Sequence, residues 1–213
     1  TTVAGGASSG DTDATGEDAR FDTPTDITTD GTNLYVTDNK NHSIRKVVIS
    51  SGVVTTFAGT SGAYGSTDDT GNDARFKNPT GITTDGTNLY VVDQGNLTIR
   101  KIVISSRVVT TLAGTAGGNS GLVIDDTGPD AAFNSPNRIT TDGTNLYVTE
   151  KDIHIIRKIV ISSGVVTTVA GTSGSAGSTD GTGADARFYK PYGLTSDGTS
   201  LYVTDNMGNI IRK

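Results

Sequence analysis

The apolar residues of this chain recur in short stretches in which they alternate with polar residues. In one copy, the stretches lie at residues 81–85, 88–93, 98–105 and 108–114. They are rich in Thr, Val, Ile and Tyr, which suit the pleated and partly buried surface of a strand. Alternation places Leu89 and Val91 on one face of the second stretch. No apolar stripe has helical spacing, so the pattern predicts an all-β chain with four strands in each copy.

The copies themselves are plain in the sequence. The string TDGTNLYVTD at 29–38 returns with few changes at 84–93, 141–150 and 196–205, and the triplet IRK recurs at spacings of 55, 57 and 55 residues. Within the string, Asp85-Gly86 is a dipeptide that accepts the positive φ of a tight hairpin turn. We therefore expect a single domain over 1–213. Its repeats lie at about 24–59, 79–114, 136–171, and 191–213 together with 1–5.

A four-stranded meander that occurs four times predicts a β-propeller of four-stranded antiparallel blades, with four blades in the chain. The fourth copy supplies only three strands, and TTVAG at 1–5 repeats the outer strand that this copy lacks. We expect this N-terminal strand to complete the last blade by pairing with Ile210–Lys213, which removes open sheet edges. Three assemblies satisfy the pattern: a closed four-bladed ring, a dimer that forms an eight-bladed ring, and a fragment of a longer array.

Composition narrows the classes of partner. The chain of 213 residues carries a net charge of −6, and the absence of Cys excludes disulfides and thiolate metal sites. Nucleic-acid binding needs clustered Lys and Arg, so the acidic balance argues against it. No apolar run approaches the roughly 18 residues of a membrane helix, so we expect no membrane insertion.

The copies resemble NHL repeats, a propeller family named for an Asn-His-Leu signature. The matching strings are PTGI (79–82), LYVTD (34–38), NHSIRK (41–46) and VVTTFAG (53–59). The linker STDGTGADARF (178–188) is similar to that of bacterial, often secreted members, which implies an extracellular or cell-surface location. The signature departs in three copies, which read Asn96-Leu97, Ile153-His154 and Gly208-Asn209. NHL propellers commonly have about six blades, whereas four copies stand here.

The linkers between copies hold two aspartates around a glycine in every copy. These candidate ligands are Asp13, Asp18, Asp68, Asp73, Asp125, Asp130, Asp180 and Asp185. Carboxylates around a glycine turn are plausible calcium ligands, because Ca²⁺ takes several oxygens from a flexible loop. The alternative, which we favour, is that each aspartate caps a turn through its own backbone. We expect no cofactor, with calcium as the alternative.

Two charged rows follow the strands of each copy. Carboxylates end the second strands at Asp38, Asp93, Glu150 and Asp205, and arginines lie early in the third strands at Arg45, Arg100, Arg157 and Arg212. A short loop joins these strands, so we expect an ion pair in every blade. Rings of charge in a channel would instead bind an ion or an anionic ligand. Repetition favours the structural role, because catalytic sites rarely need four equal copies.

The remaining candidates for chemistry are few. Some NHL propellers are zinc-dependent amidating lyases, but zinc needs three or four ligands and only His42 and His154 are present. We expect both to be solvated loop residues. The linkers end in Ala-Arg-Phe in three copies and in Ala-Ala-Phe at 131–133. We expect this Phe to plug the groove between successive blades and the Arg to bond loop carbonyls.

The residues that break the repeat are the candidate ligand anchors. They are Tyr64, Leu122, Ile124, Tyr189 and Tyr192. Because NHL propellers present one face of loops to partners, the sequence favours a non-enzymatic binding or scaffold module for a protein or other surface ligand. The alternatives are a structural subunit of an oligomeric or cell-surface assembly, such as a homodimer, and a metal-dependent lyase-like enzyme that uses the central channel.

Overall fold

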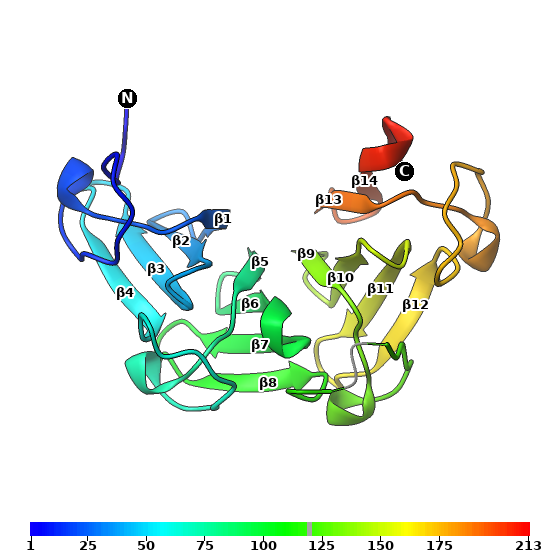
Figure 1. Ribbon diagram of the computed structural model, residues 1–213, viewed down its shortest axis with the longest axis horizontal. Helices are drawn as coiled ribbons and strands as arrows, with labels where there is room; N and C mark the ends of the chain where they lie inside the picture. The colour runs from blue at the N-terminus through cyan, green and yellow to red at the C-terminus, as the bar shows by residue number, and fades with distance from the viewer. Residues whose placement is uncertain (119–120) are drawn as a thin grey trace. The chain divides into compact units, whose positions relative to one another are not determined.

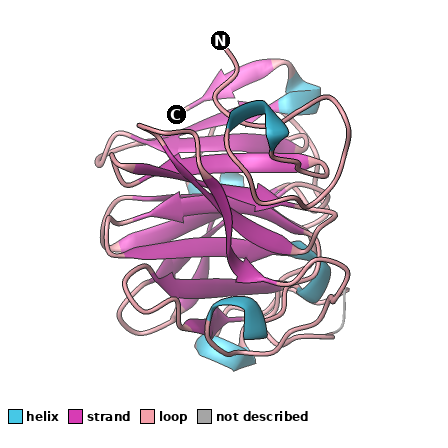
Figure 2. Ribbon diagram, turned by 90° about the vertical axis from the view of Figure 1, so that its left-hand side faces the viewer, coloured by secondary structure: helices cyan, strands magenta, loops and turns pink. Residues whose placement is uncertain are grey.

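The computed structural model describes residues 1–118 and 121–213, which form strands joined by loops and by single-turn 3-10 helices (Figure 2). No helix among these residues is long and apolar enough to cross a membrane. The helices are η1 (Gly16–Asp18), η2 (Gly71–Asp73), η3 (Gln94–Asn96), η4 (Gly128–Asp130), η5 (Gly183–Asp185) and η6 (Asn206–Gly208).

The strands fall into four sheets, each built from strands that are consecutive in the chain (Figure 1). The first sheet holds β1 (Pro24–Thr29), β2 (Asn33–Asp38), β3 (Ser43–Val48) and β4 (Val54–Gly59). The second holds β5 (Pro79–Thr84), β6 (Asn88–Asp93), β7 (Thr98–Val103) and β8 (Val109–Ala113). The third holds β9 (Pro136–Thr141), β10 (Asn145–Glu150), β11 (Ile155–Val160) and β12 (Val166–Ala170). The fourth holds β13 (Pro191–Ser196), β14 (Leu201–Asp205) and β15 (Ile210–Arg212). The predicted all-β fold of propeller blades is confirmed.

The chain divides into two compact units. The first contains Thr1–Asn96 and Arg100–Thr110, and the second contains Leu97–Ile99 and Thr111–Lys213, so the second sheet contributes to both. The third sheet and the three strands of the fourth belong to the second unit.

Within the first unit, apolar side chains of the first blade pack against those of the second. Tyr35 and Phe57 of the first blade share one buried cluster with Phe76, Leu89 and Val91 of the second. Phe76, which ends the linker before the second blade, is fully buried between the first two blades, as expected from the sequence. Full burial of one such side chain contributes roughly 1.5–3 kcal/mol.

The linker that precedes a blade returns across the outer edge of that blade's own fourth strand. Thr15 pairs with Val53 in an antiparallel bridge, and the Val54 N–H donates to the Ala14 carbonyl at 2.8 Å. The same bridges join Thr70 to Val108 and Thr127 to Val165. An uncovered edge strand invites pairing with other chains, so these three linkers protect part of the edges of the first three blades.

The N-terminal segment contacts the linker of the first blade. Its contact is the same as the one that the end of a fourth strand makes with the linker of the next blade. The Gly5 N–H donates to the Gly16 carbonyl at 2.9 Å, as Gly114 does to Gly128 at the same distance. Residues 1–5 are not assigned to a strand, and the fourth sheet has three strands, as completion by an N-terminal strand requires. Pairing of this segment with β15 stays a prediction.

A carboxylate organises the turn between the first and second strands of each blade. Asp85 accepts the N–H groups of Thr87 and Asn88 at 2.8 and 2.7 Å through Oδ1, and the Tyr90 hydroxyl at 2.8 Å through Oδ2. Gly86 has a φ of +87°, as the Asp-Gly dipeptide predicts. The same contacts surround Asp30 and Asp142.

These contacts shift the titration of both groups. Burial raises the pKa of Asp85, but the hydrogen bonds from Asn88, Thr87 and Tyr90 outweigh burial and hold this pKa below its usual range. Burial, followed by the hydrogen bond to Asp85 and its charge, raises the pKa of Tyr90. The ionised Asp therefore adds stability that is fully present above about pH 4 and is lost as the pH falls through its lowered folded value. The protonated Tyr adds stability that is present below about pH 10 and is lost above it.

We expect Asp85→Ala to lower the free energy of unfolding at pH 7 by about 1–3 kcal/mol, because it leaves the buried Tyr90 hydroxyl without its acceptor. The loss shrinks at pH 2, where the wild-type carboxyl also takes up a proton. Urea unfolding followed by circular dichroism at both pH values measures this. Thr87→Ala is the control, and an equal loss at both pH values would contradict the assignment.

Candidate functional site

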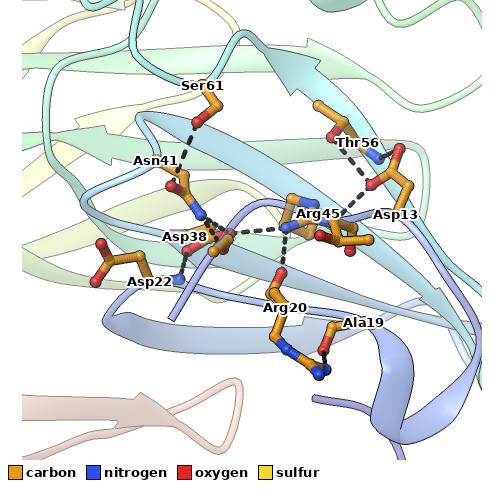
Figure 3. A network of polar contacts seen from close by, with 11 residues as sticks. Asp13, Ala19, Arg20, Asp22, Asp38, Asn41, Arg45, Thr56 and Ser61 are labelled. Carbon is orange, nitrogen blue, oxygen red and sulfur yellow. Dashed lines mark hydrogen bonds and ion pairs between the residues drawn. The ribbon is translucent and has the colours of Figure 1, made fainter. Parts of the chain in front are cut away.

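Every blade contains an arginine that holds two carboxylates from different parts of the chain. Arg45 donates to Asp38 at 2.9 Å and to Asp13 at 2.6 Å (Figure 3). Asp38 and Arg45 have fully buried side chains, whereas that of Asp13 is 46% exposed. The equivalent groups are Arg100 with Asp93 and Asp68, Arg157 with Glu150 and Asp125, and Arg212 with Asp205 and Asp180. The predicted ion pair between the two charged rows is confirmed.

The arginine also fastens the linker to the blade. The Arg45 guanidinium donates to the carbonyls of Arg20 and Thr12 at 2.8 and 3.2 Å. It lies over the Phe21 ring, 5.1 Å from the ring centroid. Five contacts, one from β2 and four from the linker, thus converge on the Arg45 side chain, which indicates a structural role.

The buried carboxylate of each pair is held from several sides. In the second blade, burial raises the pKa of Asp93 to about 6, although the charge of Arg100 and hydrogen bonds from the Lys77 N–H and the Asn96 amide oppose the rise. A raised carboxyl pKa is a feature of general acids. Here the group is fully buried and its oxygens are engaged by Arg100, Lys77 and Asn96, so the arrangement serves the blade.

The candidate calcium ligands fall into two structural classes. The first aspartate of each linker binds the blade arginine, and Asp13 and Asp125 also accept the N–H groups of Thr56 and Thr168 at 2.9 and 2.8 Å. The sequence favoured a role for these aspartates as caps of their own turns. In the structure, these carboxylates instead link the linker to the blade. The second aspartates end the 3-10 helices, at Asp18, Asp73, Asp130 and Asp185.

Across residues 1–118 and 121–213, no group of three or more His, Asp or Glu side chains is arranged to hold a metal ion. Calcium binding by the linkers stays a prediction.

The histidines are not solvated loop residues, contrary to the expectation from the sequence. His154 is 9% exposed and His42 is partly buried. The Nδ1 atom of His42 accepts the N–H of Asn78 at 3.1 Å, and that of His154 accepts the N–H of Lys190 at 3.2 Å. Each histidine thus links the turn of one blade to the first strand of the next. Burial and the charge of Lys77 lower the pKa of His42, which favours the neutral acceptor.

The five candidate anchors occupy separate places. Tyr64, 65% exposed, lies in the linker before the second blade, with its ring 5.6 Å from that of His42. Leu122 and Ile124, 46% and 39% exposed, lie in the linker before the third blade. Ile124 pairs with Ala132 and lines a cavity of about 180 Å³.

Tyr189 and Tyr192 lie together at the start of β13, on either side of Pro191. The Tyr189 ring contacts that of His154 at 5.8 Å. The guanidinium of Arg138, in β9, lies 4.8 Å from the centroid of the Tyr192 ring and donates to its hydroxyl at 3.1 Å. Arg138 was not among the residues predicted from the sequence. The signal that could have identified it is its departure from the repeat, because the other blades have Asp26, Gly81 and Gly193 at this position.

A larger hollow in the first unit has a structural origin. It measures about 500 Å³ and is lined by apolar side chains of the first blade, including Ile27, Leu34 and Val36. The equivalent side chains of the second blade, Ile82, Leu89 and Val91, are covered by the first blade. The hollow is therefore a blade-packing face, and it holds no grouping of catalytic side chains.

Two comparisons concern sequence. No family model matches the chain. The chain is 32% identical over 143 residues to NHL repeat-containing protein 2 of Bos taurus and 29% identical over 143 residues to that of Homo sapiens. Each match covers 62% of this chain and 19% of the relative, so the chain spans about a fifth of the length of these curated relatives. The resemblance to NHL repeats is confirmed.

Solved structures share the fold. An auxiliary nutrient binding protein from Bacteroides ovatus has a TM-score of 0.69 and 16% identity, over 95% of this chain and 53% of that one. One from Bacteroides thetaiotaomicron has a TM-score of 0.65 and 18% identity, over 84% and 44%. A catalytically inactive virginiamycin B lyase from Staphylococcus aureus has a TM-score of 0.54 and 21% identity, over 85% and 48%. At these identities the likeness shows the β-propeller fold alone.

Proposed function

We propose that this chain of NHL-type repeats is a non-enzymatic binding module that presents exposed aromatic residues to a protein or other ligand. The observation that carries the proposal is that the recurring charged side chains are engaged in structural contacts, whereas the exposed aromatic side chains do not recur. The charged groups that recur in all blades hold each blade to its own linker, as Arg100 does with Asp93 and Asp68. The exposed aromatic groups are instead Tyr64, Tyr189 and Tyr192, which occur where the repeat is broken.

The location of these tyrosines supports the same proposal. Tyr64 contacts a turn between second and third strands, and Tyr189 and Tyr192 stand where a first strand begins. The start of the first strand pairs with the end of the second, as Pro191 does with Asp205. The strand starts and the turns between second and third strands therefore lie at the same end of the strands in each sheet. The auxiliary nutrient binding proteins are binding proteins of the same fold, which supports a binding role here. We place the module outside the cell or at the cell surface, as the linker resemblance implies.

The test is binding of the labelled chain to a peptide array and a glycan array. We expect saturable binding to one class of probe, weakened at least about tenfold by the triple variant Tyr64→Ala, Tyr189→Asn and Tyr192→Thr. Each change installs a residue that another copy carries at that position. The control is Ile49→Ser, an exposed residue at the opposite edge of the first sheet.

Two results would contradict the proposal. One is the absence of saturable binding on both arrays. The other is stoichiometric zinc in the purified chain by mass spectrometry, which would favour a metal-dependent enzyme.

A further inference from the structure

A residue that stands at an exposed position in one copy alone is not required by the blade architecture that all copies share. Three such positions meet at one edge of the fourth blade. After the proline of the first strand stand Thr25, Thr80, Asn137 and Tyr192. Two residues before that proline stand Asp22, Lys77, Asn134 and Tyr189. In the turn after the second strand stand Lys40, Gly95, Asp152 and Met207. Only in the fourth blade are all three side chains large and aromatic or apolar.

The backbone of these three residues is held together where β13 begins and β14 ends. The Met207 N–H donates to the Tyr189 carbonyl at 2.9 Å, and Tyr189 and Tyr192 flank Pro191. Met207 is 51% exposed, Tyr189 is 39% exposed and Tyr192 is 37% exposed. The tyrosine rings are also held in place, by His154 and by Arg138. Tyr, Met and Arg are enriched at protein interfaces, and fixed rings lose little entropy on binding.

The charged groups around this cluster are mainly cationic. Arg138 lies over the Tyr192 ring. Lys190, between the two tyrosines, has a side chain that is 47% exposed and lies 3.6 Å from Asp152. Asp152 in turn lies 3.2 Å from Lys151. Two lysines thus flank one carboxylate, in a chain whose net charge is −6. Such a local field attracts carboxylates of a partner over the distance of the Debye length.

We propose that Tyr189, Tyr192 and Met207 form a docking surface for an acidic segment of a partner protein, with Lys190 beside its carboxylates. The inference rests on the proposed binding function and assigns its ligand class. An apolar residue of the segment packs on the aromatic anchors, and flanking Asp or Glu residues meet the cations. Because the cations are exposed, their share of the affinity depends on salt.

The experiment is a selection of peptides from a phage library of 12-residue segments on the whole chain. Enriched peptides are then synthesised and their dissociation constants are measured by fluorescence anisotropy. We expect enrichment of Asp and Glu beside an apolar residue. Tyr192→Thr should weaken binding at least about tenfold, and Lys190→Asn about threefold. Raising the salt concentration from about 50 to about 300 mM should weaken binding further, because salt screens exposed charges. Asn suits the positive φ of Lys190, as Asn78 shows in the second blade.

The matched control is Ile49→Ser, which removes an exposed apolar residue of the first unit and should change affinity less than about twofold. Basic or uncharged peptides, or acidic peptides insensitive to Tyr192→Thr and Lys190→Asn, would overturn this inference. If the binding of any such peptide depended on Tyr64, the proposed binding function would still stand. A selection without any enriched peptide also overturns the inference, while a glycan bound through the tyrosines would retain the binding function with another ligand.

Discussion

Replacing Arg100 with methionine is expected to lower the free energy of unfolding by about 3–5 kcal/mol, because it leaves a buried carboxylate without its cation. Arg100 and Asp93 are fully buried and lie 2.9 Å apart. The same guanidinium donates to Asp68 at 2.6 Å and to the carbonyls of Arg75 and Thr67, so the variant also detaches the linker. Equilibrium urea unfolding at pH 7 measures the loss.

Two variants sharpen this test. Arg100→Lys keeps the charge but not the planar fork, so it should recover only part of the loss. Lys101→Met changes the next residue, which points to the other face of the strand, and should cost less than about 1 kcal/mol. A cost below about 1 kcal/mol for Arg100→Met would show that the ion pair does not hold the blade.

The repeat made most of the fold predictable. The stretch 88–93 coincides with β6 (Asn88–Asp93), and the other three differ from β5, β7 and β8 by a few residues at their ends. Short strands in this chain are set by local signals that recur: β-branched residues, period-two alternation and an Asp-Gly turn. The ion pair between Asp93 and Arg100 was also predictable, because a short loop joins their strands.

The rest of the site depends on residues that are far apart in sequence. Asp13 and Arg45 are joined only because a glycine-rich linker without periodicity folds back across β4. Its single-turn helix η1 gives no apolar signal, and the path of the linker is set by backbone bonds to strand edges. His42 likewise finds its partner Asn78 across a blade junction. Spacing predicted which residues recur, and only the folded chain showed what they contact.

Replacing Gly59 with alanine is expected to cost about 4 kcal/mol of unfolding free energy, and it tests how closely the end of β4 packs on the start of β3 and on the Phe76 ring. Gly59 ends β4 with a φ of +88°, a conformation that costs an L side chain about 1–3 kcal/mol. A Cβ at this position would also lie 2.6 Å from the His42 carbonyl oxygen and 3.1 Å from the Phe76 ring. Forcing a methyl group into such a packed place costs about 1–3 kcal/mol more.

Gly86→Ala separates these two contributions. Gly86 has a φ of +87°, and a Cβ there would meet nothing within 4 Å, so only the backbone strain remains. Urea unfolding of both variants should therefore give a larger loss for Gly59→Ala, and the difference measures the steric cost of a methyl group between β3 and β4. Equal losses would mean that the His42 carbonyl and the Phe76 ring move aside freely. A larger loss at Gly59 would instead establish that the start of β3 and the end of β4 lie backbone to backbone, with the Phe76 ring of the next linker packed against them, so that any side chain there forces them apart.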